Sequence, residues 1–470
     1  APEDLIESLP QRKQGFAGRV TYAYDYRYMA ELNFGYNGSE NFAKGNRFGF
    51  FPSVAVGYNI SREKFFEKFS DVVSNLKLRA SWGLVGNDQI GGERYIYLSN
   101  IELENGDLGY TTGRDQNISK NGPKYIRYAN NDITWEVGSK WNFGIDFGIK
   151  NELNITFDIF KEIRKDIFME RQQIPDYWGT NGKDKWMNLA TNMYGNLGKV
   201  ENKGLDFSID YVKRFNNDFD MSFKGTFTYA HNKVLEYDEP DFQKYPNISR
   251  VGHSVDQQLL YIAERLFIDD SEVQRNPKQN LGGWVSGGDI KYKNLPDVNG
   301  NYDNVIDSND RQYTGMPTTP EIVYGFGPSF RYKKFDFSFF FQGAARVSIM
   351  MNGIHPFGAE GTRNVLQFIA DDYWSETNQN IYAEYPRLSK RDNENNTKAS
   401  TYWQRNGAFL KLKNLEVGFN HKFFRVYLRG SNLLTFSPFK YWDPEMGSGS
   451  GLSYPTQRVF NVGVQFSINK

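Results

Sequence analysis

A two-residue alternation within residues 141–160 is the feature that most limits the folds open to this chain. Bulky apolar residues fill every second position from Trp141 to Ile149, with polar residues or glycine between them. After Lys150-Asn151-Glu152 the alternation resumes and runs to Ile159. Strand side chains point to opposite faces with period two, so the segment is predicted to be a hairpin with one apolar and one polar face.

The same alternation recurs along the chain and predicts about 13 strands. Within residues 409–420 the phase changes at Asn414, which predicts a β-bulge. Residues 62–74 instead place apolar side chains at helical spacing and predict a short amphipathic helix. The predicted strands cover residues 15–27, 28–36, 47–60, 76–85, 141–149, 153–160, 199–212, 219–232, 321–332, 335–342, 409–420, 425–436 and 458–468.

The links between these strands alternate between short and long. The short links are at 27–28, 150–152, 213–218, 333–334 and 421–424, and the link at 61–75 is longer because it holds the predicted helix. The intervening links are at 37–46, 86–133, 165–198, 233–318, 347–407 and 437–457. A soluble sandwich has no reason to alternate in this way, whereas an outer-membrane barrel has short periplasmic turns and long external loops. If this alternation continues to the last strand, that strand follows a long link, and the C-terminus lies on the side of the short turns.

Composition excludes several classes of function. Cysteine is absent, which excludes disulfides, thiolate metal sites and cysteine catalysis. The 56 Lys and Arg balance the 56 Asp and Glu, which gives no electrostatic footprint for nucleic acid. The four histidines are scattered without metal spacing, and no nucleophile or phosphate-loop motif stands out. We therefore predict a protein that is not an enzyme, with no catalytic and no cofactor-binding residues.

The fold class predicted from these patterns is all-β: a transmembrane antiparallel β-barrel with long extracellular loops and short periplasmic turns. The alternative is a large soluble sandwich or propeller whose aromatic residues form a core. Strands of the predicted length match the roughly 9–11 residues that cross a bilayer. Bacterial single-chain barrels have even strand numbers, so either one strand is missed or the chain is the C-terminal portion of a larger barrel. The second is favoured because the chain begins within a loop and has no export signal.

Several segments resemble a known family. These are residues 9–22, 33–53, 76–87, 410–415 and 430–435, which read LPQRKQGFAGRVTY, NFGYNGSENFAKGNRFGFFPS, LKLRASWGLVGN, LKLKNL and GSNLLT. Together they are similar to the SusC/RagA family of TonB-dependent outer-membrane transporters of Bacteroidetes. The resemblance covers essentially the whole chain.

The resemblance implies a 22-stranded barrel with an N-terminal plug, as in other plugged outer-membrane transporters. It also implies a TonB-binding segment ahead of the plug, energisation by TonB-ExbB-ExbD, and a SusD-like surface lipoprotein that closes over the barrel. Family substrates are mostly oligosaccharides, with peptides in the RagA branch, and a dimer of transporter–lipoprotein pairs is a further expectation. On this basis residues 1–470 are the C-terminal part of a single TonB-dependent receptor barrel domain, without plug or TonB box.

A candidate metal site lies in the longest external link. Hard cations take several oxygen ligands from one short loop, and Asp and Asn alternate around a glycine at 297–310. The segment resembles a family motif, but it has two extra residues and lacks the second glycine, so Asn301 and Asp303 compete for one ligand role. The alternative is an Asx-rich turn stabilised by its own side chains. The candidate Ca²⁺ ligands are Asp297, Asn299, Asn301, Asp303, Asp307 and Asp310.

Aromatic residues of the external links are candidates for stacking on sugar rings, for packing the loops together, or for contacting a lid. They are Trp178, Trp186, Trp284, Trp374, Trp403, Trp442, Tyr373, Tyr382 and Tyr402. Trp82 and Trp141 are predicted to lie in an interfacial aromatic girdle. Five aspartates on polar strand faces are predicted to face a wet lumen: Asp146, Asp158, Asp206, Asp210 and Asp336.

The predicted function is import of oligosaccharides or peptides across the outer membrane, driven through TonB and assisted by a SusD-like lid. The alternative is an outer-membrane barrel that binds a surface ligand or adheres to it without import. A plug and TonB box upstream in the gene would distinguish the first function from the second.

Overall fold

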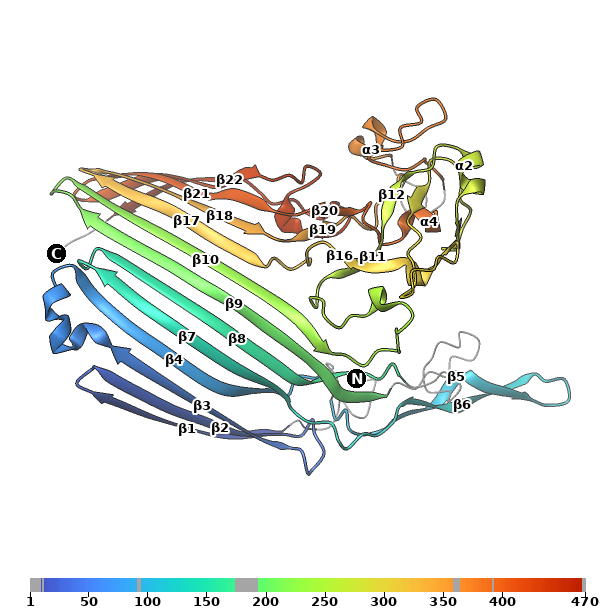
Figure 1. The fold of residues 1–470 in the computed structure, drawn as a ribbon, viewed down its shortest axis with the longest axis horizontal. Helices are drawn as coiled ribbons and strands as arrows, with labels where there is room; N and C mark the ends of the chain where they lie inside the picture. Colours follow the sequence, from blue (N-terminus) through green and yellow to red (C-terminus); the bar gives the residue numbers. More distant parts are fainter. Residues whose placement is uncertain are drawn as a thin grey trace.

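A computed structural model describes residues 10, 12–90, 94–173, 193–357, 364–390 and 393–466. Within these residues, 13 strands form a single curved sheet in which each strand pairs antiparallel with the next (Figure 1). The strands are β1 (Lys13–Tyr24), β2 (Tyr28–Ser39), β3 (Phe48–Asn59), β4 (Val73–Asn87), β7 (Glu136–Ile149), β8 (Leu153–Glu170), β9 (Tyr194–Arg214), β10 (Phe219–Glu236), β17 (Ile322–Tyr332), β18 (Phe335–Ala345), β21 (Phe409–Asn420), β22 (Phe424–Phe436) and β23 (Val459–Phe466). Each predicted strand is confirmed; the last two predicted positions, 467–468, lie outside the described residues.

The register keeps apolar and polar rows on opposite faces across neighbouring strands. Phe157 lies between Ile145 and Phe207, whereas the adjacent Thr156 lies between Asp146 and Ser208. We call the face that carries the Phe157 row the outward face and the other the inner face. Because a shift of one residue would exchange the two faces, this register fixes which side chains share a solvent.

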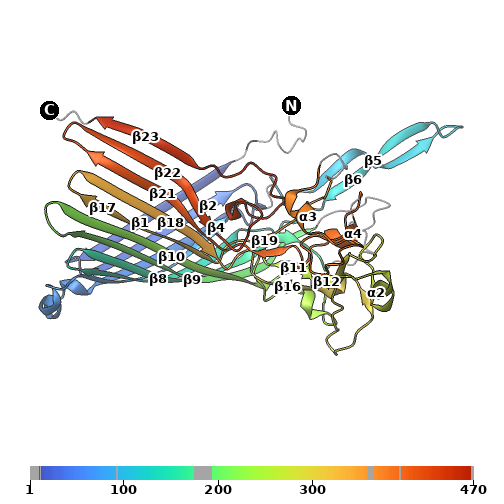
Figure 2. The same ribbon diagram turned by 90° about the horizontal axis from the view of Figure 1, so that it is seen from above.

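The short turns gather at one end of the sheet, and the long connections gather at the other. The last described residues of β23 lie at the short-turn end (Figures 1 and 2). The alternation of links and the predicted side of the C-terminal strand end are therefore confirmed. In the described part of the chain, no helix is both long enough and apolar enough to cross a membrane.

The predicted helix at 62–74 is wrong. The segment holds two 3₁₀ elements, η1 (Ile60–Arg62) and η2 (Lys64–Phe69), and β4 already begins at Val73. Glu63 between them is extended, and its carboxylate accepts hydrogen bonds from the hydroxyls of Tyr28 (2.8 Å) and Tyr58 (3.2 Å). These contacts with β2 and β3 interrupt the helical geometry that the apolar spacing suggested.

The predicted bulge is confirmed. The pairing of β21 with β22 shifts register between Leu412 and Asn414, and its pairing with β18 shifts at the same place. The link at 86–133 differs from the prediction, because it contains a hairpin of β5 (Asn100–Thr112) and β6 (Ile118–Arg127) that projects beyond the sheet (Figures 1 and 2). Most of its described side chains are exposed on both faces.

The long connections form an ordered cap, which we call the external cap: the described residues of 237–320, 347–408 and 437–458. It contains a hydrophobic core that includes Leu260, Ile290, Ile349 and Ile369. Its short strands are β11 (Gln258–Tyr261), β12 (Ala263–Leu266), β13 (Lys278–Gln279), β14 (Ile290–Tyr292), β15 (Val305–Ile306), β16 (Arg311–Thr314), β19 (Ser348–Met350) and β20 (Gln404–Asn406). Its helices are α2 (Asp270–Arg275), α3 (Gln367–Asp371) and α4 (Glu394–Thr397), with 3₁₀ turns η4 (Pro246–Ile248), η5 (Ser308–Asp310) and η6 (Pro444–Met446).

Candidate functional site

The inner face of the sheet is lined by cross-strand ion pairs. Arg79 of β4 donates to both carboxylate oxygens of Asp146 (3.0 Å each) and to Asp158 (3.0 Å), joining β4, β7 and β8. All three side chains are only partly exposed, at 32%, 25% and 14%. A charged group in hydrocarbon would be costly, so this row requires a wet environment on the inner side.

The other polar-face aspartates have partners on the same face. Arg425 contacts both Asp336 and Glu416, and Asn420 also donates to Asp336. The two remaining aspartates pair with a hydroxyl or an ammonium: Asp206 accepts from Thr228 at 2.6 Å, and Asp210 lies 3.5 Å from Lys224. All five predicted aspartates thus lie on the inner face. Each has a hydrogen-bond or ion-pair partner there, so a structural role is sufficient to explain its presence.

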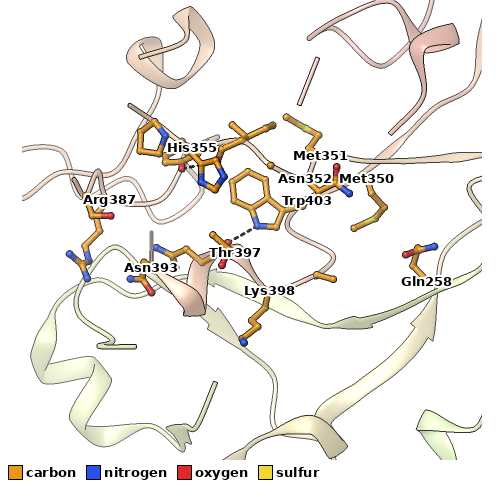
Figure 3. Close-up of a pocket in the computed structure, with 17 residues that line it drawn as sticks. Gln258, Met350, Met351, Asn352, His355, Arg387, Asn393, Thr397, Lys398 and Trp403 are labelled. Carbon is orange, nitrogen blue, oxygen red and sulfur yellow. Dashed lines mark hydrogen bonds between the residues drawn. The ribbon is translucent and has the colours of Figure 1, made fainter. Parts of the chain in front are cut away.

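The external cap encloses a small cavity of about 150 Å³ (Figure 3). Met350, Met351 and the Trp403 indole form its apolar part, while α4 contributes polar groups at its rim. The indole N–H of Trp403 donates to the Asn396 carbonyl (2.7 Å), which fixes the ring against α4. Drug-sized ligands occupy pockets of about 300–1,000 Å³, so this cavity suits at most a small group of a larger ligand.

One wall of the cavity is held by a buried charge pair. Asp289 is completely buried and accepts hydrogen bonds from Arg387 Nε (2.7 Å) and Nη2 (3.1 Å) and from Asn396 Nδ2 (2.9 Å). Asp289 precedes β14, Arg387 lines the cavity and Asn396 belongs to α4. The carboxylate of Asp289 therefore joins the start of β14 to two residues that follow it by 98 and 107 positions.

A second carboxylate makes the external cap sensitive to acid. Burial by itself would raise the pKa of Glu272, but hydrogen bonds from Arg265, the Ile268 amide and Lys291 outweigh burial and lower the pKa to about 2. A depressed pKa contributes stability above the unfolded value of about 4.5 that is lost as the pH falls toward about 2. We expect hydrogen exchange of α2 and β12 to speed up over that range. The Glu272→Gln variant should lose this pH dependence, and an unchanged profile in the variant would contradict the assignment.

The external aromatic residues separate into buried and exposed sets. Trp374 and Trp403 are buried in the cap core, and Trp442, Tyr373 and Tyr402 pack against it, so these five hold the loops together. Trp284 and Tyr382 are 80% and 73% exposed. Trp178 and Trp186 lie outside the described residues. On the outward face, Trp82 and Trp141 are cross-strand neighbours with ring centroids 6.0 Å apart, and their girdle position stays a prediction.

The predicted metal loop is folded by its own side chains. Asp297 accepts from the amides of Asn299 (2.8 Å) and Asn301 (2.9 Å), and Asp303 accepts from the amide of Val305 (3.0 Å). The hydrogen bond from the Asn301 amide is the main reason that the pKa of Asp297 is lowered.

The end of this loop is closed by a capping box. Asp307 and Asp310 cap η5 reciprocally, and Asp310 also accepts from the Leu295 amide (2.7 Å). Burial raises the pKa of Asp310. In the residues that the structure describes, no group of three or more His, Cys, Asp and Glu side chains is arranged to hold a metal. This geometry matches Asx turns, and calcium binding stays a prediction.

A buried lysine at the loop end of the sheet was not predicted from the sequence. Lys411 of β21 is fully buried and contacts Asp443 (2.6 Å) and Glu445 (2.5 Å), which anchors η6 to the sheet. Lysine is almost never fully buried unless it is paired. Its partners follow it by 32 and 34 residues, so no local spacing could have revealed the pair.

Long antiparallel strands, short turns at one end, a folded cap at the other and a charged inner face together define the wall of a membrane β-barrel. No family model matches the chain. It is 28% identical over 478 residues to the TonB-dependent receptor P3 of Formosa agariphila, covering 95% of this chain and 44% of the relative. It is 28% identical over 469 residues to the TonB-dependent receptor SusC of Bacteroides thetaiotaomicron, covering 96% of this chain and 43% of SusC. The chain thus spans less than half of the length of these relatives.

Solved structures show the same fold. The RagAB peptide transporter matches with a TM-score of 0.70 and 22% identity, covering 97% of this chain and 47% of that chain. The RagAB peptide importer in its open-open state matches with a TM-score of 0.72. The resemblance to SusC/RagA-type TonB-dependent receptors that the sequence motifs indicated is confirmed. The names of these matching proteins are those of receptors and transporters, and none is that of an enzyme.

Proposed function

We propose that this chain forms the C-terminal part, residues 1–470, of an outer-membrane barrel that imports oligosaccharides or peptides. The observation that carries the proposal is the ion-paired inner face, which begins at the short-turn end and leads to the folded external cap. Arg79, Asp146 and Asp158 on this face provide a polar path for hydrophilic solutes. The plug, the remaining strands of a 22-stranded barrel and the TonB box would belong to the other half of a protein as long as the relatives.

The proposed partners follow from the proposed transport. A SusD-like lipoprotein would close over the external cap, TonB-ExbB-ExbD would supply energy, and two transporter–lipoprotein pairs would associate. SusC and the RagAB transporter, to which the chain is similar, support this proposal. The substrate class stays open between glycan and peptide.

The proposal is tested by deleting the gene in its source bacterium and measuring uptake of fluorescent oligosaccharides and peptides. We expect uptake of one class to be lost, and to be restored by the complete gene only in cells with an intact TonB. Surface binding of the ligand that requires the gene, with no accumulation inside the cells, would favour the adhesion alternative.

The exposed aromatics of the external cap give a more specific prediction. We expect Trp284→Ala with Tyr382→Ala to weaken capture of the lipoprotein or of the substrate by about 2 kcal/mol, because large exposed aromatic rings are frequent binding hot spots. Co-purification and ligand binding measure the two effects separately. Tyr110→Ala is the control, because Tyr110 is also exposed (61%) but lies on the β5–β6 hairpin. Equal losses in both variants would contradict the assignment.

We also propose that the 297–310 loop binds Ca²⁺ when Asp297, Asn299, Asn301, Asp303, Asp307 and Asp310 turn from backbone amides toward an ion. Isothermal calorimetry of the full-length protein should then show saturable calcium binding. Asp297→Asn with Asp303→Asn should weaken this binding, because hard cations favour carboxylate oxygen. Absence of binding heat in the unmodified protein would leave the loop as a set of Asx turns.

A further inference from the structure

The outward face of the sheet carries an apolar hollow that solute transport does not use. It has a volume of about 480 Å³ and lies across β3, β4, β7 and β8. Its apolar walls come from Val54, Val56, Trp82, Trp141, Phe143 and Ile159. The hollow exists because Ala80 stands between Val56 and Phe143, where its methyl group leaves space beside larger neighbours.

Cationic side chains lie at the loop end of this hollow. Lys161 lines it and pairs across the strands with Trp141 on one side and Lys203 on the other. Lys203 in turn pairs with His231 of β10, and Lys233 follows two residues later on the same face. Lys161 and Lys203 are 49% and 60% exposed, and Lys233 is also exposed. About half or more of the side chains of Lys161 and Lys203 is therefore accessible from outside the sheet.

The acidic groups nearby do not neutralise this cluster. Glu201 lies 2.6 Å from Lys161 and 3.8 Å from Lys203, and is only 16% exposed. Glu321 is already held by Arg346 (2.6 Å) and by His231 (2.5 Å). Further toward the loops, Glu236 is paired with Lys199 (3.0 Å). Three lysines thus face one carboxylate.

On the outward face of β7 and β8, the first charged residue after the short turn is Lys161, next to Trp141. Between the short turn and Trp141, the outward positions of β7 and β8 are all apolar, ending at Trp141 and Ile159. Tryptophan marks the membrane–water interface of barrels, and lysine stems extend along apolar surface while their ammonium groups reach the headgroups. The hollow therefore lies where acyl chains run, and the lysines lie where phosphates lie.

We propose that the hollow beside Ala80 and the lysine cluster Lys161, Lys203 and Lys233 form a binding site for one phosphorylated lipid of the outer leaflet. An acyl chain would occupy the hollow, and a lipid phosphate would contact the ammonium groups. This inference rests on the proposed outer-membrane location. It does not depend on what the barrel transports.

The test uses the full-length protein, delipidated in detergent and titrated with phosphorylated lipid A, dephosphorylated lipid A or inorganic phosphate under native mass spectrometry. Each lysine near an anionic lipid contributes roughly a fivefold gain in binding, so Lys161→Gln, Lys203→Gln and Lys233→Gln together should weaken phosphorylated lipid A binding on the order of 100-fold. The same variant should bind dephosphorylated lipid A as the parent does. Ala80→Leu should weaken binding of both lipids, because it fills the hollow.

The matched control is Lys140→Gln. Lys140 adjoins Trp141 but points to the inner face, where it lies 3.6 Å from Glu162. It should leave lipid binding unchanged. Equal affinity in the parent and the triple variant, an equal loss in Lys140→Gln, or binding of inorganic phosphate as tight as that of the phosphorylated lipid would overturn the proposal. If the triple variant does not assemble, the Lys→Arg triple should retain binding while Ala80→Leu reduces it. A parent protein that does not insert into bilayers would refute the membrane location itself.

Discussion

Replacing Phe157 by lysine is expected to impair assembly of the sheet in the membrane. Phe157 is on the outward face between Ile145 and Phe207, midway between the short turn and Trp141. A lysine on the lipid face near the bilayer midplane costs about 2–4 kcal/mol. The yield of heat-modifiable, folded protein in outer-membrane fractions measures the effect.

Thr156→Lys is the matched control for this prediction. Thr156 precedes Phe157 but points to the inner face beside Asp146, which can accept an ammonium group. Asp146 and Asp158 themselves are poorer control positions, because both accept hydrogen bonds from Arg79. Equal assembly of Phe157→Lys and Thr156→Lys would contradict the assignment of the outward face to lipid.

Removing Arg387 is expected to loosen the external cap while leaving the sheet intact. Asp289 would then remain buried without the two guanidinium hydrogen bonds that it accepts. Breaking a buried ion pair by deleting one partner costs about 3–5 kcal/mol. We expect Arg387→Ala to lie near the lower end of that range, because Arg387 is 27% exposed.

Hydrogen exchange localises this second effect. Peptides that contain β14 and α4 should exchange faster in Arg387→Ala, whereas peptides from β7 and β8 should not change. Arg387→Lys should recover only part of the protection, because an ammonium group cannot reproduce the two-pronged contact of a guanidinium group. The control is Lys390→Ala, since Lys390 is exposed. Uniform protection in all these variants would show that the Asp289 pair does not hold the cap together.

The long strands were predictable because their signal is local. The alternation within residues 141–160 needs only the period of a strand, and the register of β7 with β8 then follows from the three-residue turn between them. The bulge at Asn414 was readable for the same reason, since a change of phase is visible within a single strand.

Predictions that depended on distant contacts were less successful. The apolar spacing at 62–74 indicated a helix, but Glu63 is extended and bonded to Tyr28 and Tyr58 of neighbouring strands. Sequence also could not separate Trp403, which is buried in the cap core, from Trp284, which is exposed. Both are tryptophans in long links, and their burial depends on how those links fold against one another.

The sequence by itself therefore determined the two-faced strands, their number in the described sheet, the alternation of turns and loops, and the resemblance to SusC-type receptors. Only the tertiary structure decided which side chains meet. Arg387 and Asp289 are 98 residues apart, and Arg79 is 67 and 79 residues from its two aspartates. The physical reason is that strand periodicity acts over a few residues, whereas charge pairing and burial depend on the register and on the packing of the whole sheet and cap.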